Sequence, residues 1–436
     1  MSKKNKQWNA NAPKINVLAY CDAPTCATGF GTVSRNIFEG LYRTGRYNID
    51  ILGINYWGDP HSFPYRIWPT GTNQDKDPYG RKKVCGMLPQ MEYDILFFLQ
   101  DTFILDFLTE IIPHLKNQGK KFKSICYFPV DGTPKEQWIK NISVVDYPIA
   151  YSEFGKSEAQ KAYGDCPELD VIPHGVNIEE YKPLPKDEVS DFRTRYFGPH
   201  ADKFIFTNLN RNQQRKDIPR TIQAFVEFRK HVKDSILYLH MAQQDQGWDL
   251  KEICKAYNLD TTKDVIFPEN FGPNQGYPRQ VVNMLYSCSD CVISTTLGEG
   301  WGLSWIEAMA TKTPVIMPGN TALVESITED KGILTKSGAD ASHFTILPHD
   351  NEIIRPLVDV EDMVEKMLWV YNNYDEAMVK AETAYEWVTN DLNWQGKIAD
   401  RWVSVFDKMY TEVTKIGTDP KLESQEENKE IESEEF

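Results

Sequence analysis

Residues 298–310 read GEGWGLSWIEAMA and follow an apolar run, CVIS, at residues 291–294. The apolar run predicts a buried strand and the segment after it predicts a helix, which places three glycines at a strand-to-helix corner. Glycines there let the backbone turn tightly and approach a ligand closely, and the first N–H groups of a helix favour a phosphate. The corner also carries Glu299 and Glu307, eight positions apart, and carboxylates beside an anion site suit hydroxyl groups. The segment therefore predicts binding of a ligand with phosphates and hydroxyls, such as a sugar nucleotide.

The rest of the chain alternates between apolar runs and helical patterns, in two sets. The first set has strand candidates at residues 15–20, 49–54, 95–99, 124–128 and 147–150. A proline-containing connector separates it from the second set, whose strand candidates are residues 204–207, 236–239, 265–267, 291–293 and 314–317. Alternating strands and helices form parallel sheets, which bind ligands at the carboxyl ends of their strands. We therefore expect an α/β protein with two doubly wound, Rossmann-like domains that face a cleft.

The composition is that of an ordinary soluble protein, with 41% hydrophobic and 25% charged residues among 436. No apolar run reaches the roughly 18 residues of a membrane span, and the basic start, MSKKNK, lacks the apolar region of a signal peptide. Eight scattered cysteines fit reduced thiols, so we expect a cytoplasmic protein. The net charge is −15, yet residues 1–150 hold 18 Lys and Arg against 14 Asp and Glu. The first domain is thus expected to be the more basic one.

Two pairs of residues have a spacing that is typical of metal or redox sites. Asp75 and Asp77 lie in a polar stretch, where a solvated turn is the simpler interpretation. Cys288 and Cys291 lead into a predicted buried strand and have no second pair of ligands nearby in the sequence, so we interpret them as core thiols. We therefore expect no metal site.

A second motif, NLNRNQQRKD at residues 208–217, follows the first strand of the second set. Arginine and lysine five positions apart, at Arg211 and Lys216, can converge on one diphosphate. Together with the corner at 298–310, this motif resembles the Gly-Arg-Leu…Lys-Gly and Glu-x7-Glu signatures of glycosyltransferase family 4 (glycosyl transferases group 1), which are retaining enzymes of the GT-B fold. The sequence departs from the family where Asn210 and Asp217 replace glycines.

The resemblance implies a role for each matching residue. Glu307 would hold the donor ribose and Glu299 would contact the transferred sugar. Arg211 and Lys216 would stabilise the departing diphosphate, acting as catalytic groups. The backbone around the glycine corner would bind the same phosphates, through Gly300, Trp301, Gly302 and Leu303.

The first domain supplies further positions by the same resemblance. Gly29 and Gly31 form a loop that would flank the donor phosphate. Asp131, after a predicted strand, is the candidate for contacting the acceptor hydroxyl or the donor sugar. His174, in the segment VIPHGVN at 171–177, stands where the family has an asparagine between its domains and is assigned to donor binding.

The predicted organisation has five parts. It consists of a flexible N-terminus at 1–14, an acceptor domain at 15–178 with a loop-rich insertion at 56–90, a nucleotide-sugar domain at 186–385, a helix at 386–415 that would cross back to the first domain, and a disordered acidic tail at 418–436. The crossing helix is implied by the resemblance, whereas the tail follows from two lysines against eight acidic residues with little apolar content.

The expected reaction is transfer of a sugar from a nucleoside diphosphate, with UDP and GDP favoured, to an acceptor hydroxyl, with retained configuration and without metal or other cofactor. The acceptor stays open between a glycan or glycolipid, a hydroxymethylated base in DNA, as modified by some phages, and a protein or small molecule. With DNA as acceptor, the protein would be phage-encoded and act in the host cytoplasm. Basic and aromatic residues suit either DNA or a glycan. The candidate acceptor residues are Trp57, Arg66, Trp68, Arg81 and Lys82.

Two other functions fit the same fold. A sugar-nucleotide epimerase would share it, and a non-catalytic protein could bind a sugar nucleotide or a nucleic acid without turnover. The combination of Glu-x7-Glu with the Arg211–Lys216 motif favours the transferase.

Overall fold

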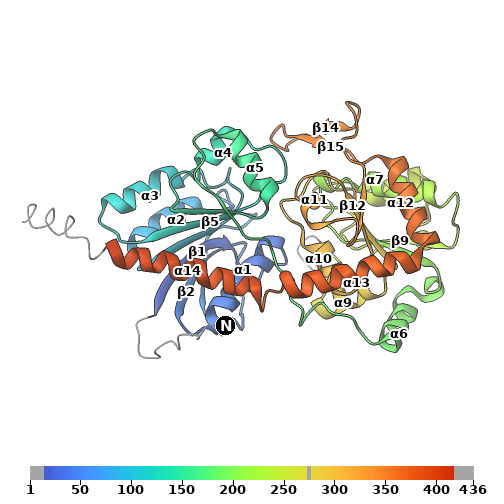
Figure 1. The fold of residues 1–436 in the computed structure, drawn as a ribbon, viewed down its shortest axis with the longest axis horizontal. Helices are drawn as coiled ribbons and strands as arrows, with labels where there is room; N and C mark the ends of the chain where they lie inside the picture. Colours follow the sequence, from blue (N-terminus) through green and yellow to red (C-terminus); the bar gives the residue numbers. More distant parts are fainter. Residues whose placement is uncertain (1–13, 273–275, 417–436) are drawn as a thin grey trace, which may run out of the picture.

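The computed structural model describes residues 14–272 and 276–416 and contains two parallel β-sheets, each surrounded by helices (Figure 1). Apart from Lys14, the N-terminus and acidic tail predicted from the sequence lie outside the described residues. The strand order is β3-β2-β1-β4-β5-β6-β7 in one sheet and β10-β9-β8-β11-β12-β13 in the other. The predicted α/β fold with two Rossmann-like domains is thus confirmed.

The strands of the first sheet are β1 (Ile15–Asp22), β2 (Tyr47–Ile54), β3 (Arg66–Pro69), β4 (Ile95–Leu99), β5 (Lys123–Phe128), β6 (Tyr147–Ala150) and β7 (Asp170–Val171). Those of the second are β8 (Phe204–Asn208), β9 (Ser235–Leu239), β10 (Val265–Ile266), β11 (Cys291–Ile293), β12 (Val315–Pro318) and β13 (Ile333–Thr335). A separate antiparallel hairpin pairs β14 (Phe344–Ile346) with β15 (Ile354–Pro356).

The helices of the first domain are α1 (Gly29–Arg43), α2 (Arg81–Met87), α3 (Leu108–Asn117), α4 (Glu136–Lys140) and α5 (Glu153–Ala162), with the 3-10 turn η1 (Leu88–Gln90). The remaining helices are α6 (Lys186–Phe197), α7 (Ile218–Phe228), α8 (Leu250–Ala256), α9 (Arg279–Ser287), α10 (Leu303–Ala310), α11 (Leu323–Ser326), α12 (Val360–Asn372), α13 (Tyr374–Asp391) and α14 (Lys397–Ile416). Two further 3-10 turns are η2 (Gly198–His200) and η3 (Gln214–Lys216).

Local sequence explains the central elements. Every residue of β4, ILFFL, is buried, as is every residue of β9, SILYL. Continuous apolar runs of this kind are expected where helices cover both faces of a parallel sheet. Helix α1 begins beyond Thr28, whose side-chain oxygen accepts a hydrogen bond from the Gly31 N–H at 3.0 Å and so caps the helix.

The strand order places the candidate site. In each sheet the chain reverses its direction of growth between two adjacent central strands, β1 and β4 in the first and β8 and β11 in the second. Loops at the carboxyl ends of such strands diverge and leave room for a ligand. The glycine corner follows β11 and the Arg211–Lys216 motif follows β8, so both lie at this position.

The last two helices run along both domains in Figure 1. On the first domain, the Trp402 ring of α14 packs 4.8 Å from the ring of Tyr127 and 5.7 Å from that of Phe97, measured between centroids. Near the junction of the domains, the Val176 N–H donates to the Leu392 carbonyl at 2.7 Å. Helix α14 therefore contributes to the core of the first domain. None of the helices in the described part of the chain combines the length and apolar character of a membrane-spanning helix.

Residues 56–90 are more regular than the sequence indicated. They include β3, which pairs in parallel with β2, and helix α2. Strand β3 has four residues, too few for a period to stand out among turn-forming neighbours. The β14–β15 hairpin is a further element that the sequence pattern did not predict.

Candidate active site

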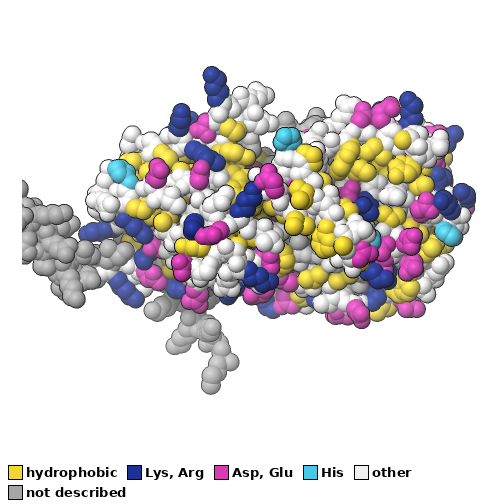
Figure 2. Space-filling view, turned by 90° about the horizontal axis from the view of Figure 1, so that it is seen from above, with side chains coloured by type: hydrophobic (Ala, Val, Ile, Leu, Met, Phe, Trp, Pro, Cys, Tyr) yellow, Lys and Arg dark blue, Asp and Glu magenta, His cyan; other side chains and the backbone are white. Residues whose placement is uncertain are grey.

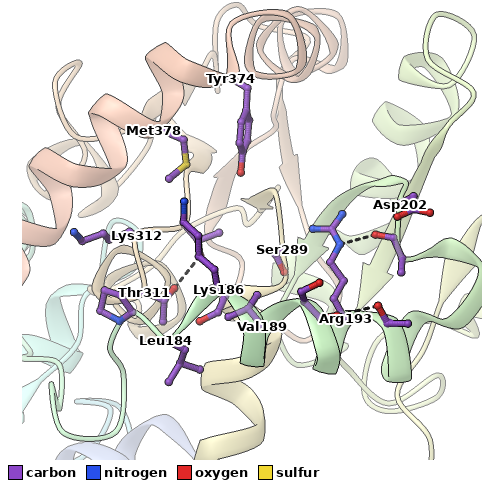
Figure 3. Close-up of a pocket in the computed structure, with 16 residues that line it drawn as sticks. Leu184, Lys186, Val189, Arg193, Asp202, Ser289, Thr311, Lys312, Tyr374 and Met378 are labelled. Atoms are coloured by element: carbon purple, nitrogen blue, oxygen red, sulfur yellow. Dashed lines mark hydrogen bonds between the residues drawn. The ribbon is translucent and has the colours of Figure 1, made fainter.

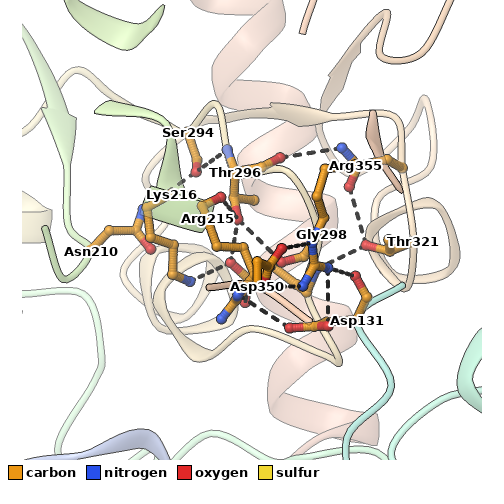
Figure 4. A network of polar contacts seen from close by, with 12 residues as sticks. Asp131, Asn210, Arg215, Lys216, Ser294, Thr296, Gly298, Thr321, Asp350 and Arg355 are labelled. Carbon is orange, nitrogen blue, oxygen red and sulfur yellow. Dashed lines mark hydrogen bonds and ion pairs between the residues drawn. The ribbon is translucent and has the colours of Figure 1, made fainter. Parts of the chain in front are cut away.

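Glu299 and Lys216 form the centre of the site. Figure 4 shows Lys216 in this polar network with Arg215 and Thr296. Lys216, in turn η3, donates a hydrogen bond to Oε1 of Glu299, and the Thr296 hydroxyl donates to the same oxygen at 2.8 Å. Burial raises the pKa of the Glu299 carboxyl, but Lys216 and Arg215 outweigh this and bring it to about 2. Glu299 is therefore an ionised acceptor of hydrogen bonds at neutral pH.

Arg215 connects this pair to the first domain. Its Nε lies 3.2 Å from Oδ2 of Asp131, its Nη1 lies 3.4 Å from Oε2 of Glu299, and Nη1 also donates to the Gly298 carbonyl. Burial raises the pKa of Asp131, but Arg215 and then Arg355 lower it more, so its net shift is downward. Arg215 was not among the site residues predicted from the sequence, although it stands next to Lys216 in the basic motif.

The glycine corner brings the two domains into contact. A Cβ atom added to Gly300 would lie 2.7 Å from Cβ of Pro129, in the loop after β5, and one added to Gly29 would lie 3.9 Å from Cδ1 of Leu303. Gly302 has a φ of 89°, which L-residues rarely adopt. The indole N–H of Trp301 is buried without a hydrogen-bond partner among the described residues. This tight backbone leaves the start of α10 open to a ligand's phosphates.

Glu307 lies on α10, outside the Glu299 network. Its Oε2 accepts a hydrogen bond from the Tyr286 hydroxyl at 3.0 Å. Burial raises the pKa of its carboxyl to about 7, against an ordinary value of 4.5, and the hydrogen bonds of Tyr286 and Tyr181 only partly offset this. Nearby, Glu180 pairs with Arg35 and Arg279 at 3.1 and 2.9 Å.

Replacing Glu307 with glutamine is expected to stabilise the free protein at alkaline pH. Because the pKa of Glu307 is higher in the folded state, folding favours the protonated form, and stability falls as pH rises from about 4.5 through about 7. Glu307→Gln should therefore gain up to about 3 kcal/mol at pH 8 and nothing at pH 4. Thermal melting across this pH range measures the difference. Parallel wild-type and variant curves would contradict the assignment.

Two first-domain carboxylates that the sequence analysis overlooked lie at strand ends. Asp22 ends β1, where burial raises its pKa to about 6, and it accepts a hydrogen bond from the Thr28 hydroxyl at 2.7 Å. Asp101 follows β4; burial, and then the charge of Asp131, raise its pKa to about 7. An acidic residue at the end of β1 and another two positions beyond β4 were the available signal.

Several residues assigned from the sequence lie apart from this network. Arg211 pairs with Asp245 at 2.6 Å and its side chain is 41% exposed. His174 is buried, its Nδ1 lies 2.8 Å from the Tyr127 hydroxyl, and burial lowers its pKa to about 3. His174 thus stays neutral in the core and does not join the donor loop. A Cβ on Gly31 would meet the Cys26 carbonyl at 2.6 Å, so the loop itself requires this glycine.

Three of the candidate acceptor residues bond to carboxylates of the first domain. Arg66 begins β3 and pairs with Asp50 at 3.0 Å, beside a hollow of about 610 Å³ at the amino ends of the strands. This is the edge opposite the Asp131 loop, so the structure places Arg66 away from the network around Glu299. The Trp68 indole also donates to Asp50, at 2.9 Å. Arg81 pairs with Asp106 at 2.7 Å.

The two other candidate acceptor residues are Trp57 and Lys82. Trp57 is 56% exposed, and the backbone N–H of Lys82 donates to the Asp77 carboxylate at 3.0 Å.

Another cavity, of about 440 Å³, lies between α6, the end of α9 and the start of α13, away from the Glu299 network (Figure 3). No group of three or more His, Cys, Asp or Glu side chains that could hold a metal occurs in the described ranges.

Comparison with known proteins shows which family the second domain resembles. Residues 193–346 match the model of the family "Glycosyl transferases group 1". The chain is 21% identical over 262 residues to human alpha-1,3/1,6-mannosyltransferase ALG2, covering 53% of this chain and 61% of that one. It is 26% identical over 161 residues to alpha-monoglucosyldiacylglycerol synthase of Streptococcus pneumoniae, covering 36% and 34%. The matches thus span about three-fifths or less of these relatives.

Solved structures with a similar fold superpose on nearly the whole of this chain. Sucrose-phosphate synthase from Thermosynechococcus elongatus has a TM-score of 0.70 at 17% identity, covering 92% of this chain and all of that one. Anabaena HepE, solved in complex with UDP and glucose, has a TM-score of 0.67 at 15% identity, covering 90% and 100%. Residues 193–346 are thus similar to the glycosyl transferases group 1 family, and the two domains together have the GT-B fold.

Proposed function

We propose that this protein is a retaining glycosyltransferase that moves a sugar from a nucleoside diphosphate to an acceptor hydroxyl without a metal ion. The observation that carries this proposal is the Glu299–Lys216 pair at the carboxyl end of β11, next to the start of α10 and opposite Asp131. A cation and a helix start favour the diphosphate, and ionised carboxylates favour sugar hydroxyls.

The donor would bind across this corner. Its diphosphate would meet Lys216 and the backbone from Gly300 to Leu303, while Glu299 accepts hydrogen bonds from the sugar and Glu307 from the ribose. Arg211 would exchange Asp245 for a phosphate oxygen, which its half-exposed guanidinium allows. Positive groups placed where the leaving diphosphate gains charge lower the barrier of transfer.

Retention follows if the acceptor attacks on the face from which the diphosphate leaves. The acceptor oxygen forms a bond to the anomeric carbon, the bond from that carbon to the phosphate oxygen breaks, and the acceptor proton passes to the departing phosphate. Asp131 would orient a hydroxyl and not remove its proton, because two arginines lower its pKa and make it a weak base.

A glycan or glycolipid is the acceptor that we propose. By name, the two relatives are a mannosyltransferase and a monoglucosyldiacylglycerol synthase. Arg66 and Arg81, two basic residues that are candidates for contacting DNA, are paired with Asp50 and Asp106. Acidic and basic side chains are also interspersed over the face seen in Figure 2, whereas a DNA-binding surface is strongly basic. We place the reaction in the cytoplasm.

The test is a panel of UDP-, GDP-, ADP- and dTDP-sugars measured by thermal shift and by slow donor hydrolysis. One nucleotide should raise the melting temperature, since a ligand at about 100 times its Kd stabilises the fold by about 2.7 kcal/mol. Glu299→Gln should bind nucleotide yet hydrolyse the donor slowly. With an acceptor, the anomeric proton coupling in the product reports retention. No response to any nucleotide would refute the proposal.

A further inference from the structure

The β14–β15 hairpin extends from the second domain toward the first (Figure 1). Its register pairs Thr345 with Arg355 and Ile346 with Ile354. Because successive side chains on a strand point to opposite faces, Ile354 is 64% exposed whereas Arg355 is only 2% exposed. A guanidinium is costly to bury unless it is paired, so the contacts of Arg355 indicate what the hairpin does.

Arg355 has carboxylate partners on both sides. Within the hairpin, its Nε lies 2.6 Å from Oδ2 of Asp350 and its Nη2 donates to Oδ1 of Asp350 at 3.0 Å. Across the domain boundary, its Nη1 lies 3.0 Å from Oδ1 of Asp131 and also donates to the Asp131 carbonyl. Arg215 approaches the other carboxylate oxygen of Asp131. Both oxygens of Asp131 are therefore held by guanidinium groups from the second domain.

Two glycines make room for this contact. A Cβ atom on Gly132 would lie 2.8 Å from Cγ2 of Ile353 and 3.0 Å from Nη1 of Arg355. One on Gly298 would lie 2.1 Å from the Asp131 carbonyl and 3.0 Å from the same nitrogen. The loops of both domains are thus shaped around the Arg355 guanidinium, which is evidence for a built contact and not for a chance surface pair.

We propose that Arg355 is a positioning residue of the transfer site, which reaches from the hairpin of the second domain and holds Asp131 of the first domain beside Arg215 and Glu299. This inference rests on the proposed function. Arg355 acts on the reacting groups only through Asp131, whose carboxylate it orients from one side while Arg215 holds it from the other. Two bonds to the carboxylate and carbonyl of one residue fix both the side chain and the loop of Asp131.

The charged groups around Asp131 come from four segments. Arg215, Arg355 and Lys216 are the cations, and Glu299 and Asp101 are the neighbouring carboxylates. Without Arg355, Asp131 would keep Arg215 as its one paired cation, beside the charge of Lys216, against these two carboxylates. Its position would loosen, and misplacement of about 1 Å at a reacting group can reduce turnover about 100-fold.

The experiment compares Arg355→Met, Arg355→Lys and Asp131→Asn in transfer assays with the donor fixed at saturation. Arg355→Met should lower kcat about 10- to 100-fold, leave the thermal shift caused by the donor unchanged, and be partly rescued by Arg355→Lys. If Arg355 acts through Asp131, the double variant Arg355→Met/Asp131→Asn should be no slower than Asp131→Asn alone, since residues that act as a unit are not additive.

The control is Lys135→Ala, because Lys135 pairs with Glu352 of the same hairpin at 2.6 Å on the exposed side. It removes a hairpin contact without touching Asp131 and should keep kcat. If Arg355→Met does not fold, Asp350→Asn loosens the same guanidinium. Multiplicative effects in the double variant, or an Arg355→Met enzyme as fast as the control, would overturn the inference. A wild-type protein without transfer would instead refute the proposed function.

Discussion

Lys216→Met is expected to reduce transfer about 100- to 1000-fold, the loss that follows removal of one preorganised charge-stabilising group. Lys216 lies in the centre of the site and donates to Glu299. Burial lowers the pKa of its ammonium group, while the carboxylate of Glu299 opposes that shift. In the transition state, the departing diphosphate gains negative charge and would attract the ammonium more strongly than the bound donor does. The measurement is kcat at saturating donor.

The fold should survive this change, because Glu299 keeps Arg215 and Thr296 as partners. Lys230→Met is the matched control, since Lys230 forms an exposed pair with Glu227 on the outside of the second domain. Surface pairs of this kind contribute little to stability, and turnover should be unchanged. A Lys216→Met enzyme within a few-fold of the control would remove Lys216 from the proposed machinery.

Gly302→Ala is expected to cause the largest loss of stability, about 3 to 5 kcal/mol from overpacking and backbone strain together. An added Cβ would lie 1.3 Å from Cη2 of Trp305, so the buried indole would have to leave its place. The φ of 89° adds strain for any residue with a side chain. Urea or thermal unfolding would measure the loss, and donor binding should be lost with it because the start of α10 moves.

Gly86→Ala is the control for this substitution. Gly86 lies within α2 and an added Cβ meets nothing within 4 Å, so alanine should be neutral or stabilise by about 0.4 to 1 kcal/mol. Shortening Trp305 to leucine should also reduce the additional cost of Gly302→Ala, since both changes act on the same space. A Gly302→Ala protein as stable as the wild type would contradict the packing of Trp305 on this glycine.

Much of the fold could be predicted because its signals are local. The five buried residues of β4 are adjacent in the sequence, and so are the residues of the glycine corner after β11. Hydrophobic periodicity and backbone sterics therefore predict both features without knowledge of distant residues. The elements that escaped prediction are short or irregular. Strand β3 has four residues, and the strands of the hairpin have three each.

The site could be predicted only in part, for a related reason. Glu299 and Lys216 belong to motifs whose residue spacing can be recognised in a single sequence, and the structure brings the two side chains together. Arg215 stands beside Lys216 but was indistinguishable from a solvated cation. Arg211, matched by its motif, pairs with Asp245 in the structure. A motif identifies residue types, whereas the direction of each side chain depends on the loop that carries it.

The sequence by itself determined the two parallel sheets, the phosphate-favouring corner at residues 298–310 and the basic motif after β8, because hydrophobic period and glycine sterics act between near neighbours. Only the tertiary structure decided that Arg355 meets Asp131, 224 positions away, that His174 is buried as a neutral core residue, and that Arg66 lies at the edge opposite the site. Those outcomes depend on how two domains and a hairpin pack, and burial and charge pairing exist only once distant segments have come together.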